Sequence, residues 1–523
     1  MIQPGSPDRR RMVIVFVCAF VSFAYFLQGG GPNQNSRFDL VRAVVEHHTF
    51  VIDPYASNTI DKSQRGGHFY SDKAPGLSFA AVPLYAAYHA LRGTSQPTGD
   101  DDRLALYLLT VAIVGLPAAA GAAALFAMAR RTGVGPTSAA IAALAWCFGT
   151  NAFAYATIFV AHQFVAALVM IAWALLHDAR TSRSPTRVTA RVATAGFLGA
   201  WAAISEYPLA VVGVFLFAYG VTRLGPRAML PFALAAGAPL LLLGAYNASC
   251  FGSPFALGYA HLADPGFRAV IARGFFGLAT PSARVAWELV MGEFRGLLPL
   301  SPFLALSAIG YVRLLRRRDL RAEGILCLAS AVFLGLLNAS YLRWDGGMAM
   351  GPRYFVPALP FVIFPVAHGF TALLEVARRE LRAASLAMAG SAVALSVAIC
   401  TMSVAVMPEF IDAPLPSPVP EQRAPDPARP ITTFVLPLFV AGHVGEKAMI
   451  ASGAMGFSSL IPGHERDAYN VGETLGLRGM ATLAPLLLAW LLTVIALARV
   501  RDPSRAPVYT GGRSAPRMTA PPP

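Results

Sequence analysis

Long apolar stretches constrain this chain more than any other feature, because they recur from one end to the other. A helix that crosses a lipid bilayer needs about 20 mostly apolar residues. Twelve stretches approach or reach that length: 12–30, 104–129, 136–152, 155–177, 191–206, 208–222, 228–246, 297–314, 324–341, 354–375, 383–406 and 480–498. The sequence therefore predicts an all-α polytopic membrane protein with about twelve transmembrane helices.

The composition favours a membrane protein over the soluble classes. Of the 523 residues, 55% are hydrophobic and only 13% are charged, whereas a soluble domain carries about 25% charged residues. The five cysteines lie in or beside apolar stretches, without metal-ligand spacing and without a pair in an extramembrane segment, so we expect no disulfide framework. Intrinsic disorder and a secreted disulfide scaffold are therefore poor interpretations.

The arginines predict the orientation in the bilayer. The net charge of +14 would also suit a nucleic-acid-binding protein. However, 24 arginines fall in segments that lie on one side if the twelve stretches cross: 1–11, 130–135, 178–191, 223–227, 313–323, 376–382 and 499–523. By the positive-inside rule this side is the cytoplasm. We expect cytoplasmic termini, a bacterial cytoplasmic (inner) membrane location and no nucleic-acid partner.

The stretch 76–91 is apolar but short, and it contains Pro83. If it crossed the bilayer, the basic loops 130–135 and 178–191 would be exported, against the positive-inside rule. We therefore expect 76–91 to be a re-entrant or interfacial helix.

The predicted spans divide the chain into four parts. Residues 1–406 form a transmembrane core with a catalytic first loop at 31–103. Residues 407–479 begin as a Pro-rich linker and continue as the apolar segment ITTFVLPLFVAGHVG, broken by Pro437, which we interpret as an interfacial lid. Residues 480–498 form the last transmembrane helix, and 499–523 form a disordered cytoplasmic tail. Because the cytoplasmic connections are short, we expect any active site in the large extracytoplasmic loops.

The first loop carries the residue types that a charged, polar substrate requires. Apolar residues at helical spacing predict a helix from Asn35 to Glu46, with Asn35 and Asp39 on one face. A carboxylate can deprotonate an acceptor hydroxyl, and a lysine or arginine can bind a phosphate leaving group. The alternative is a set of solvated loop residues. The candidates are Asp39, Asp53, Asp61, Asp72, Arg37, Lys62, Lys73, His68 and Tyr70.

The later outer loops add polar candidates at the membrane surface. Arg353 lies at the outer end of a span, where it needs an anionic partner, either a buried acid or a lipid phosphate. Glu206 also faces the outer side, and we favour a structural role for it. The remaining candidates are Trp344, Asp345, Glu293 and Arg295.

Several segments resemble the GT-C superfamily of membrane glycosyltransferases, which use polyprenyl-phosphate sugars. Within it, the chain is similar to the bacterial branch with protein mannosyltransferase-like and Rgt-type lipopolysaccharide glycosyltransferases. The stretch YSDKAPGLSFAAVPLY resembles the Tyr-Ser…Pro-Gly segment of that family. Further similar segments are FGSPFALGY, RGLLPLSP, WDGGMAMGPRYFVPALPF and NVGETLGLRGMATLAPLLL.

The resemblance implies a sugar transfer from a polyprenyl-phosphate donor, at the surface of the lipid bilayer, to an extracytoplasmic glycan, lipid or protein acceptor, by an inverting displacement. The acidic pair of the family falls at Asn35–Ser36, where this chain has no acid. Asp39, one turn later, is the nearest substitute, and Asp53, Asp61 and Asp72 are the alternatives. Arg353 and Lys73, then Lys62 and Arg37, would bind the donor phosphate. No cofactor is required, although a divalent metal remains open.

The substrate contacts that we expect are Asn35, His68, Tyr70, Trp344, Asp345, Glu293 and Arg295. Two other classes of function remain: a transporter or flippase for a lipid-linked or anionic substrate, and a non-catalytic membrane protein of the same fold. Transporters keep ionisable residues at the bilayer midplane. Here the middles of the spans are almost free of charge, which favours an enzyme acting at one surface.

Overall fold

The computed structural model describes residues 6–27, 31–93, 99–347, 349–406, 428–442, 444 and 469–500. Helices dominate these ranges, and the only named strands within them are β1 (Lys62–Arg65) and β2 (His68–Ser71). The all-α architecture that the sequence predicts is thus confirmed, with the addition of one hairpin.

Eight helices within the described residues are long and apolar enough to cross a membrane. They are Asp102–Arg131 (most of α4 Gly99–Leu109, then η2 Thr110–Gly115 and α5 Leu116–Arg131), α8 (Ala161–Ala179), α9 (Pro185–Ser205), Arg227–Phe251 (η3 Arg227–Met229 and α11 Leu230–Phe251), α16 (Arg321–Ser340), Arg353–Leu374 (η6 Arg353–Ala358 and α17 Leu359–Leu374), α18 (Arg379–Val406) and Gly479–Arg499 (η10 Gly479–Leu483 and α22 Ala484–Arg499). Each one overlaps a predicted stretch.

The other four predicted stretches contain shorter or interrupted helices. Three of them hold α1 (Pro7–Phe23), α6 (Pro136–Phe148) and α10 (Leu209–Leu224), with 17, 13 and 16 residues. The stretch 297–314 is divided into α14 (Leu297–Leu300), η5 (Pro302–Ala305) and α15 (Leu306–Arg316). Proline at 299 and 302 removes N–H donors that a continuous helix would need. Eight described helices, rather than twelve, therefore reach spanning length.

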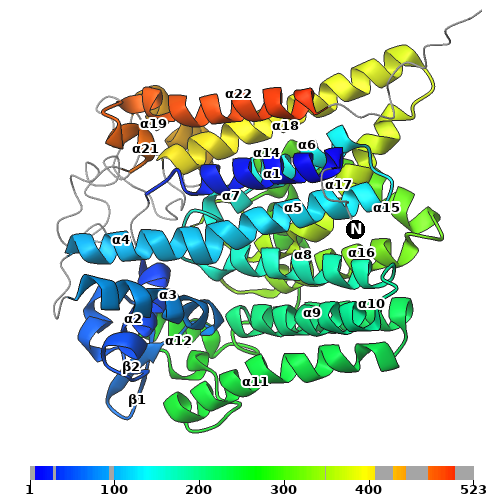
Figure 1. The fold of residues 1–523 in the computed structure, drawn as a ribbon. Coiled ribbons are helices and arrows are strands. Elements are labelled where there is room, and N and C mark those ends of the chain that lie inside the picture. The colour runs from blue at the N-terminus through cyan, green and yellow to red at the C-terminus, as the bar shows by residue number, and fades with distance from the viewer. Residues whose placement is uncertain are drawn as a thin grey trace, which may run out of the picture.

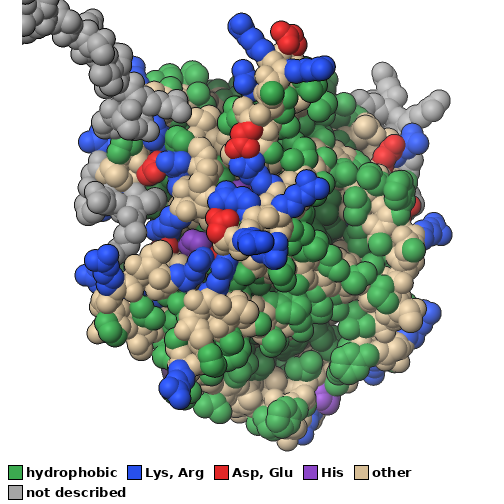
Figure 2. Space-filling view, turned by 90° about the vertical axis from the view of Figure 1, so that its right-hand side faces the viewer, with side chains coloured by type: hydrophobic (Ala, Val, Ile, Leu, Met, Phe, Trp, Pro, Cys, Tyr) green, Lys and Arg blue, Asp and Glu red, His purple; other side chains and the backbone are tan. Residues whose placement is uncertain are grey.

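The bundle has two ends of different character (Figure 1). One end, which we call the arginine end, holds the basic segments. Their contacts with one another include Arg130–Asp8 at 3.0 Å, Arg131–Asp178 at 2.8 Å, Arg180–Glu323 at 3.1 Å and Arg313–Glu375. Figure 2, which faces this end, shows basic side chains gathered among hydrophobic ones. The segments that the arginine pattern assigns to one side therefore lie together.

The opposite end, which we call the loop end, carries the first loop. It consists of α2 (Pro32–Glu46), η1 (Asp53–Asn58), the β1–β2 hairpin and α3 (Gly76–Arg92), which gather at the left of Figure 1. Gly66 and Gly67 form the hairpin turn with φ of +62° and +86°, a conformation that only glycine adopts easily twice in succession.

Helix α3 stays at the loop end. The indole N–H of Trp201, near the end of α9, donates to the carbonyl of Gly76 at 3.0 Å, and the hydroxyl of Tyr85 donates to Glu46 at 2.5 Å. The next helix, α4, contacts the end of α1, where Tyr107 donates to the Ala24 carbonyl at 2.7 Å. The start and the middle of α3 are therefore held by α9 and α2.

Short elements complete the loop end: α7 (Ala152–Tyr155), η4 (Gly258–His261), α12 (Pro265–Ile271), α13 (Ala283–Met291) and α21 (Val471–Thr474). The segment predicted as broken at Pro437 is instead helical, as η7 (Ile431–Val435) followed by α19 (Leu436–Val440). A π-type turn ahead of the proline accommodates its missing N–H. Most of the predicted linker and lid, 407–427 and 445–468, and the predicted tail at 501–523 lie outside the described residues.

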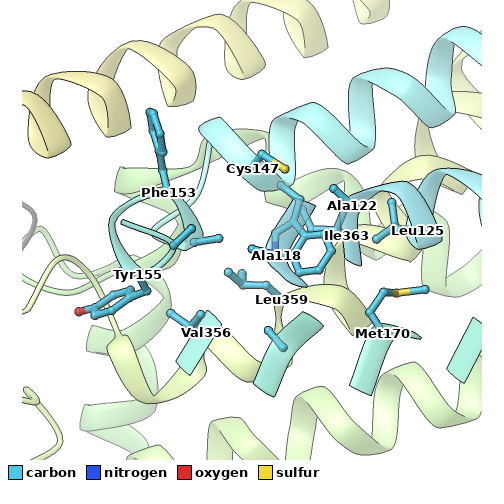
Figure 3. Packing of buried hydrophobic residues seen from close by; sticks show 14 of the residues in the cluster. Ala118, Ala122, Leu125, Cys147, Phe153, Tyr155, Met170, Val356, Leu359 and Ile363 are labelled. Atoms are coloured by element: carbon cyan, nitrogen blue, oxygen red, sulfur yellow. The ribbon is translucent and has the colours of Figure 1, made fainter. Parts of the chain in front are cut away.

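The core lies between α5, α6, α8 and α17, where aliphatic and aromatic side chains interdigitate (Figure 3). Small residues permit close helix approach here, as in many membrane bundles. A Cβ built on Gly121 of α5 would lie 3.0 Å from the Cα of Ala167 on α8, and one built on Gly310 of α15 would overlap the Pro365 carbonyl of α17. This packing holds the ends of the helices, and the loops between them, in place.

Candidate active site

Helix α2 presents two different polar faces at the loop end. Arg37 and Asp39 are two positions apart, so a helical period of 3.6 residues places them on nearly opposite faces. Both are buried, at 3% and 0% exposure. Arg37 points to the core helices, whereas Asp39 points to η1. The face of α2 therefore decides which candidates can act together.

The Arg37 guanidinium joins the first loop to the core. Its Nη2 lies 3.2 Å from Oε1 of Glu206, the residue that ends α9, and its Nη1 donates to the Ala74 carbonyl at 3.1 Å. Glu206 also lies 3.5 Å from Nδ1 of His162, in the first turn of α8. Arg37 of α2 and His162 of α8 thus converge on one carboxylate at the end of α9.

Lys73 holds a second group of charges directly after β2. Its Nζ lies 3.0 Å from Asp61 and 3.2 Å from Asp72. Burial acts to lower the pKa of Lys73, but the two carboxylates outweigh it and the pKa lies above its usual value. Burial raises the pKa of Asp72, and the neighbouring Lys73 ammonium opposes that rise. The lysine therefore stays charged between two acids.

The two groups form one cluster around Glu206. Burial raises the pKa of the Glu206 carboxyl, and the charges of Arg37, Arg353 and Lys73 oppose the rise, in that order. Arg353 itself lies over the ring of Tyr354 at 5.0 Å and donates to its hydroxyl at 3.2 Å. The Tyr354 ring meets His162 edge-on, with 6.0 Å between the ring centroids. Arg353 is thus linked to Glu206 through the rings of Tyr354 and His162, and its charge acts on the Glu206 carboxyl as those of Arg37 and Lys73 do.

We call this group the cation cluster: Arg37, Lys73, Arg353, Asp61, Asp72, Glu206 and His162. Ser36, where the family's acidic pair would fall, lies beside it: its Oγ is 2.8 Å from the Oγ of Ser71. Because Asp72 follows Ser71 directly, the hairpin brings a carboxylate close to the position that lacks one. Oδ1 of Asp72 makes no hydrogen bond to the described residues.

Asp39 lies apart from the cation cluster, in an amide-rich setting. Its Oδ1 accepts from Nδ2 of Asn58 at 3.0 Å, and Asn35 donates to the Asn58 carbonyl at 2.9 Å. The shared face predicted for Asn35 and Asp39 is confirmed by this common partner. Burial raises the pKa of Asp39 to about 8, and its Oδ2 makes no hydrogen bond to the described residues.

The remaining hairpin candidates face away from these groups. Asp53, 39% exposed, lies 2.8 Å from Nδ1 of His68. Tyr70 packs edge-on against Phe251, with 5.7 Å between the ring centroids. Lys62 lies over the ring of Phe69 at 4.9 Å and donates to the Ala56 carbonyl. Among the described residues, Lys62 thus has no hydrogen bond or ion pair with a member of the cation cluster.

The candidates of the later loops pair with other protein groups. Glu293 pairs with Arg429 at 3.0 Å, with both side chains 61% exposed. Asp345 accepts from the Gly347 N–H at 3.0 Å and lies 3.3 Å from Arg343, and Trp344 meets Phe294. Arg295, only 1% exposed, donates to the carbonyls of Gly347 and Ala349. Asp345 has its partners within its own loop, whereas Glu293, Trp344 and Arg295 contact a different loop.

Glu206 and His162 are the members of the site that sequence reasoning did not select. Glu206 directly follows a predicted span, in SEYP, and its acidic character at a helix end was a usable signal. His162 lies inside an apolar stretch, where a single histidine indicates little. Among the described residues, no group of three or more His, Cys, Asp or Glu could hold a metal ion.

Comparisons with known proteins give likenesses in structure only. No protein-family model matches the sequence, and no curated protein matches it. ArnT from Cupriavidus metallidurans bound to undecaprenyl phosphate is similar, with 14% sequence identity and a TM-score of 0.48 over 93% of this chain and 76% of that one. Its apo state is similar too, with 14% identity and a TM-score of 0.47 over 94% of this chain and 76% of that one. A third similar structure is the archaeal oligosaccharyltransferase AglB from Archaeoglobus fulgidus, in complex with an inhibitory peptide and a dolichol-phosphate. It has 12% sequence identity and a TM-score of 0.44 over 75% of this chain and 56% of that one. These likenesses concern the path of the chain, not the side chains of the site.

Proposed function

We propose that this chain is a membrane glycosyltransferase of the GT-C type, which moves a sugar from a polyprenyl-phosphate carrier to an acceptor hydroxyl. The observation that carries the proposal is the cation cluster. It collects Arg37, Lys73 and Arg353 from distant parts of the sequence beside buried carboxylates, at one end of an apolar bundle. Buried cations beside a bilayer suit the phosphate of a lipid carrier.

Asp72 is the general base in this proposal, ahead of Asp39. Asp72 lies within the cation cluster, and its Oδ1 has no hydrogen-bond partner among the described residues, so that oxygen can accept a proton. Burial raises its pKa towards the range in which a carboxylate works as a base near neutral pH. Asp39 has a raised pKa too, but it lies on the far face of α2 from Arg37.

The reaction is an inverting displacement at the anomeric carbon. The acceptor hydroxyl gives its proton to Oδ1 of Asp72 while its oxygen forms the new bond to the sugar. The bond between the anomeric carbon and the phosphate oxygen breaks, and the electron pair leaves with the polyprenyl phosphate. Arg353, Arg37 and Lys73 stabilise the charge that develops on that phosphate, which is the largest contribution such a site can make.

The placement in the cell follows from the arginine pattern. With the arginine end in the cytoplasm of a bacterial cell, both termini are cytoplasmic, and the cation cluster faces the extracytoplasmic side of the inner membrane. The acceptor is then a glycan, lipid or protein of the cell envelope. The reaction as written needs no cofactor, because cationic side chains neutralise a monophosphate leaving group.

The test is mass spectrometry of envelope glycans and lipids from the producing cell. A deletion strain is complemented with the wild-type gene or with Asp72→Asn, Asp39→Asn or Asp53→Asn, and equal amounts of protein are confirmed by blotting. We expect one sugar to be missing from the deletion and from the Asp72→Asn strain, since loss of a general base costs about 100-fold or more in rate. Asp53→Asn, an exposed carboxylate of the same hairpin, should restore the sugar.

The other outcomes discriminate between the alternatives. If Asp72→Asn restores the sugar and Asp39→Asn does not, the base is Asp39 and the site lies on the other face of α2. If every glycan is unchanged in the deletion strain, the transfer reaction is contradicted. Purified protein that moves a labelled lipid-linked sugar across a vesicle membrane without transferring it would establish a flippase instead.

A further inference from the structure

A glycine-rich segment leads directly into Arg353. Its described residues are 346–347 and 349–352, and we call these the 346–352 segment. Gly346, Gly347 and Gly351 have φ of +74°, +66° and +62°, values that exclude a regular helix or strand. Backbone carbonyls in such a segment have no ladder or helical partners, and a buried carbonyl needs one. The Pro352 carbonyl accepts from the Phe355 N–H at 2.9 Å, and side chains from elsewhere in the chain supply further donors.

Two buried side chains provide four of these bonds. Arg295, between α13 and α14, donates Nη2 to the Gly347 carbonyl at 2.6 Å and Nη1 to the Ala349 carbonyl. Asn151, just before α7, donates Nδ2 to the carbonyls of Met350 and Pro352 at 3.3 and 3.4 Å. Each side chain is only 1% exposed. The segment is thus held from two sides by groups that solvent does not reach.

The held segment touches the Arg353 side chain. A Cβ built on Gly346 would lie 3.0 Å from both Cγ and Nε of Arg353, so the backbone of the segment lies directly against the arginine stem. Tyr354 contacts the guanidinium, at 3.2 Å from its hydroxyl. Any shift of the Gly346 backbone would therefore move the guanidinium.

We infer that Arg295 and Asn151 are positioning residues, which fix the 346–352 segment and through it the guanidinium of Arg353. The inference rests on the proposed function, in which Arg353 binds the donor phosphate. Arg295 donates Nη1 and Nη2 to carbonyls of the protein and is only 1% exposed, so in this inference it acts through Arg353 and not on the substrate. A guanidinium suits this role because its planar fork reaches two carbonyls at once, whereas a lysine is a compact point charge.

The experiment is a double-mutant cycle on the purified full-length protein in detergent. The probe is a polyprenyl monophosphate, and the matched probe is the polyprenol without phosphate. We expect Arg353→Gln and Arg295→Met each to weaken monophosphate binding about tenfold, as for loss of a charge-assisted hydrogen bond. The double variant should bind no more weakly than Arg353→Gln alone, because Arg295 acts through Arg353. Polyprenol binding should stay unchanged.

A control variant, a second measurement and a replacement variant complete the experiment. Arg343→Gln removes an exposed arginine of the same loop, which pairs with Asp345, and should leave binding unchanged. Hydrogen exchange of the backbone amides in the 346–352 segment should rise in Arg295→Met but not in Arg353→Gln. This measurement reports how firmly Arg295 holds the segment, independently of the binding affinity. If Arg295→Met does not fold, Asn151→Ala enters the same cycle with Arg353→Gln.

The outcomes separate the two proposals. If Arg353→Gln leaves monophosphate binding intact, the phosphate role of Arg353 and the proposed function built on it fail. If Arg353→Gln weakens binding but Arg295→Met and Asn151→Ala do not, only the positioning role fails. Losses that add in the double variant would also overturn it, because they would mean that Arg295 acts independently of Arg353.

Discussion

The acids of the first loop differ in burial and in whether both carboxylate oxygens have a hydrogen-bond partner. Asp39 and Asp72 are buried with one oxygen lacking a partner among the described residues, whereas Asp53 is exposed and hydrogen-bonded to His68 and the Phe69 N–H. A buried ionised carboxylate without full pairing costs stability, and such groups concentrate at functional sites. Burial and hydrogen bonding thus distinguish aspartates that look alike in the sequence.

The stability of the protein should depend on pH through Asp39. Its pKa is about 8 when folded and about 4 when unfolded. Between these values the folded state binds more protons, so the free energy of unfolding falls as pH rises, and the full penalty applies above pH 8. Asp39→Asn cannot ionise. It should therefore raise the thermal unfolding temperature at pH 9 relative to the wild type, with little difference at pH 5.

The matched comparison is Asp53→Asn. Although burial acts to raise it, hydrogen bonds from His68 and the Phe69 N–H hold the pKa of Asp53 below its usual value. Ionised Asp53 therefore contributes stability above the unfolded pKa, and its loss should lower the unfolding temperature slightly at both pH 5 and pH 9. Thermal unfolding in detergent measures both variants. An Asp39→Asn protein that is less stable at pH 9 would show that Asp39 is paired and ionised.

At the scale of elements, the positions of the loops depend on close contacts between helices. Gly310 lets α15 lie against the Pro365 carbonyl of α17, and Gly196 lets α9 lie against the Phe232 carbonyl of α11. Helix α9 ends at Glu206, and α17 follows directly from Arg353 in η6. The two helices that carry these members of the cation cluster thus depend on glycines for their packing.

Gly310→Ala should destabilise the protein. Its Cβ would overlap the Pro365 carbonyl, a backbone atom that cannot move aside alone, and overpacking of this kind costs about 1–3 kcal/mol. Gly213→Ala in α10 is the control, since a Cβ there meets nothing within 4 Å. Because alanine is the better helix former, this change should be neutral or stabilising. Thermal unfolding in detergent compares the two, and equal effects would contradict the close approach.

At the scale of the whole molecule, the two ends of the bundle differ in charge chemistry. At the arginine end, Glu323 is fully buried and contacts Arg180, Arg223 and Tyr219, which joins α8, α10 and α16. The loop end holds the cation cluster and the hairpin. The proposed orientation places the arginine end in the cytoplasm and the loop end outside.

Cysteine labelling tests this orientation. All five native cysteines are buried, so they give a low background. Thr181→Cys lies at the exposed arginine end between α8 and α9, and Thr280→Cys lies in the exposed segment before α13. A membrane-impermeant maleimide should label Thr280→Cys in intact cells, and Thr181→Cys only after permeabilisation. The reverse pattern would place the cation cluster in the cytoplasm.

Local patterns in the sequence were enough to predict much of the fold. Apolar length located the membrane helices, because each must bury its backbone polar groups within itself. The arginine distribution grouped the connections correctly, since Arg130, Arg180 and Arg313 all lie at one end. The shared face of Asn35 and Asp39 followed from the helical period. All of these are properties of short segments.

By itself, then, the sequence determined the class of fold and which connections share one end of the bundle, and it proposed the residue types of the candidate site, since each depends on local length, period or composition. Only the tertiary structure decided which of those residues meet. It brought Asp39 to Asn58 of η1, joined Arg37 to Glu206 across 169 positions, and directed Arg295 to the segment before Arg353. These choices depend on how distant helices pack and where their loops end, and no local pattern encodes that.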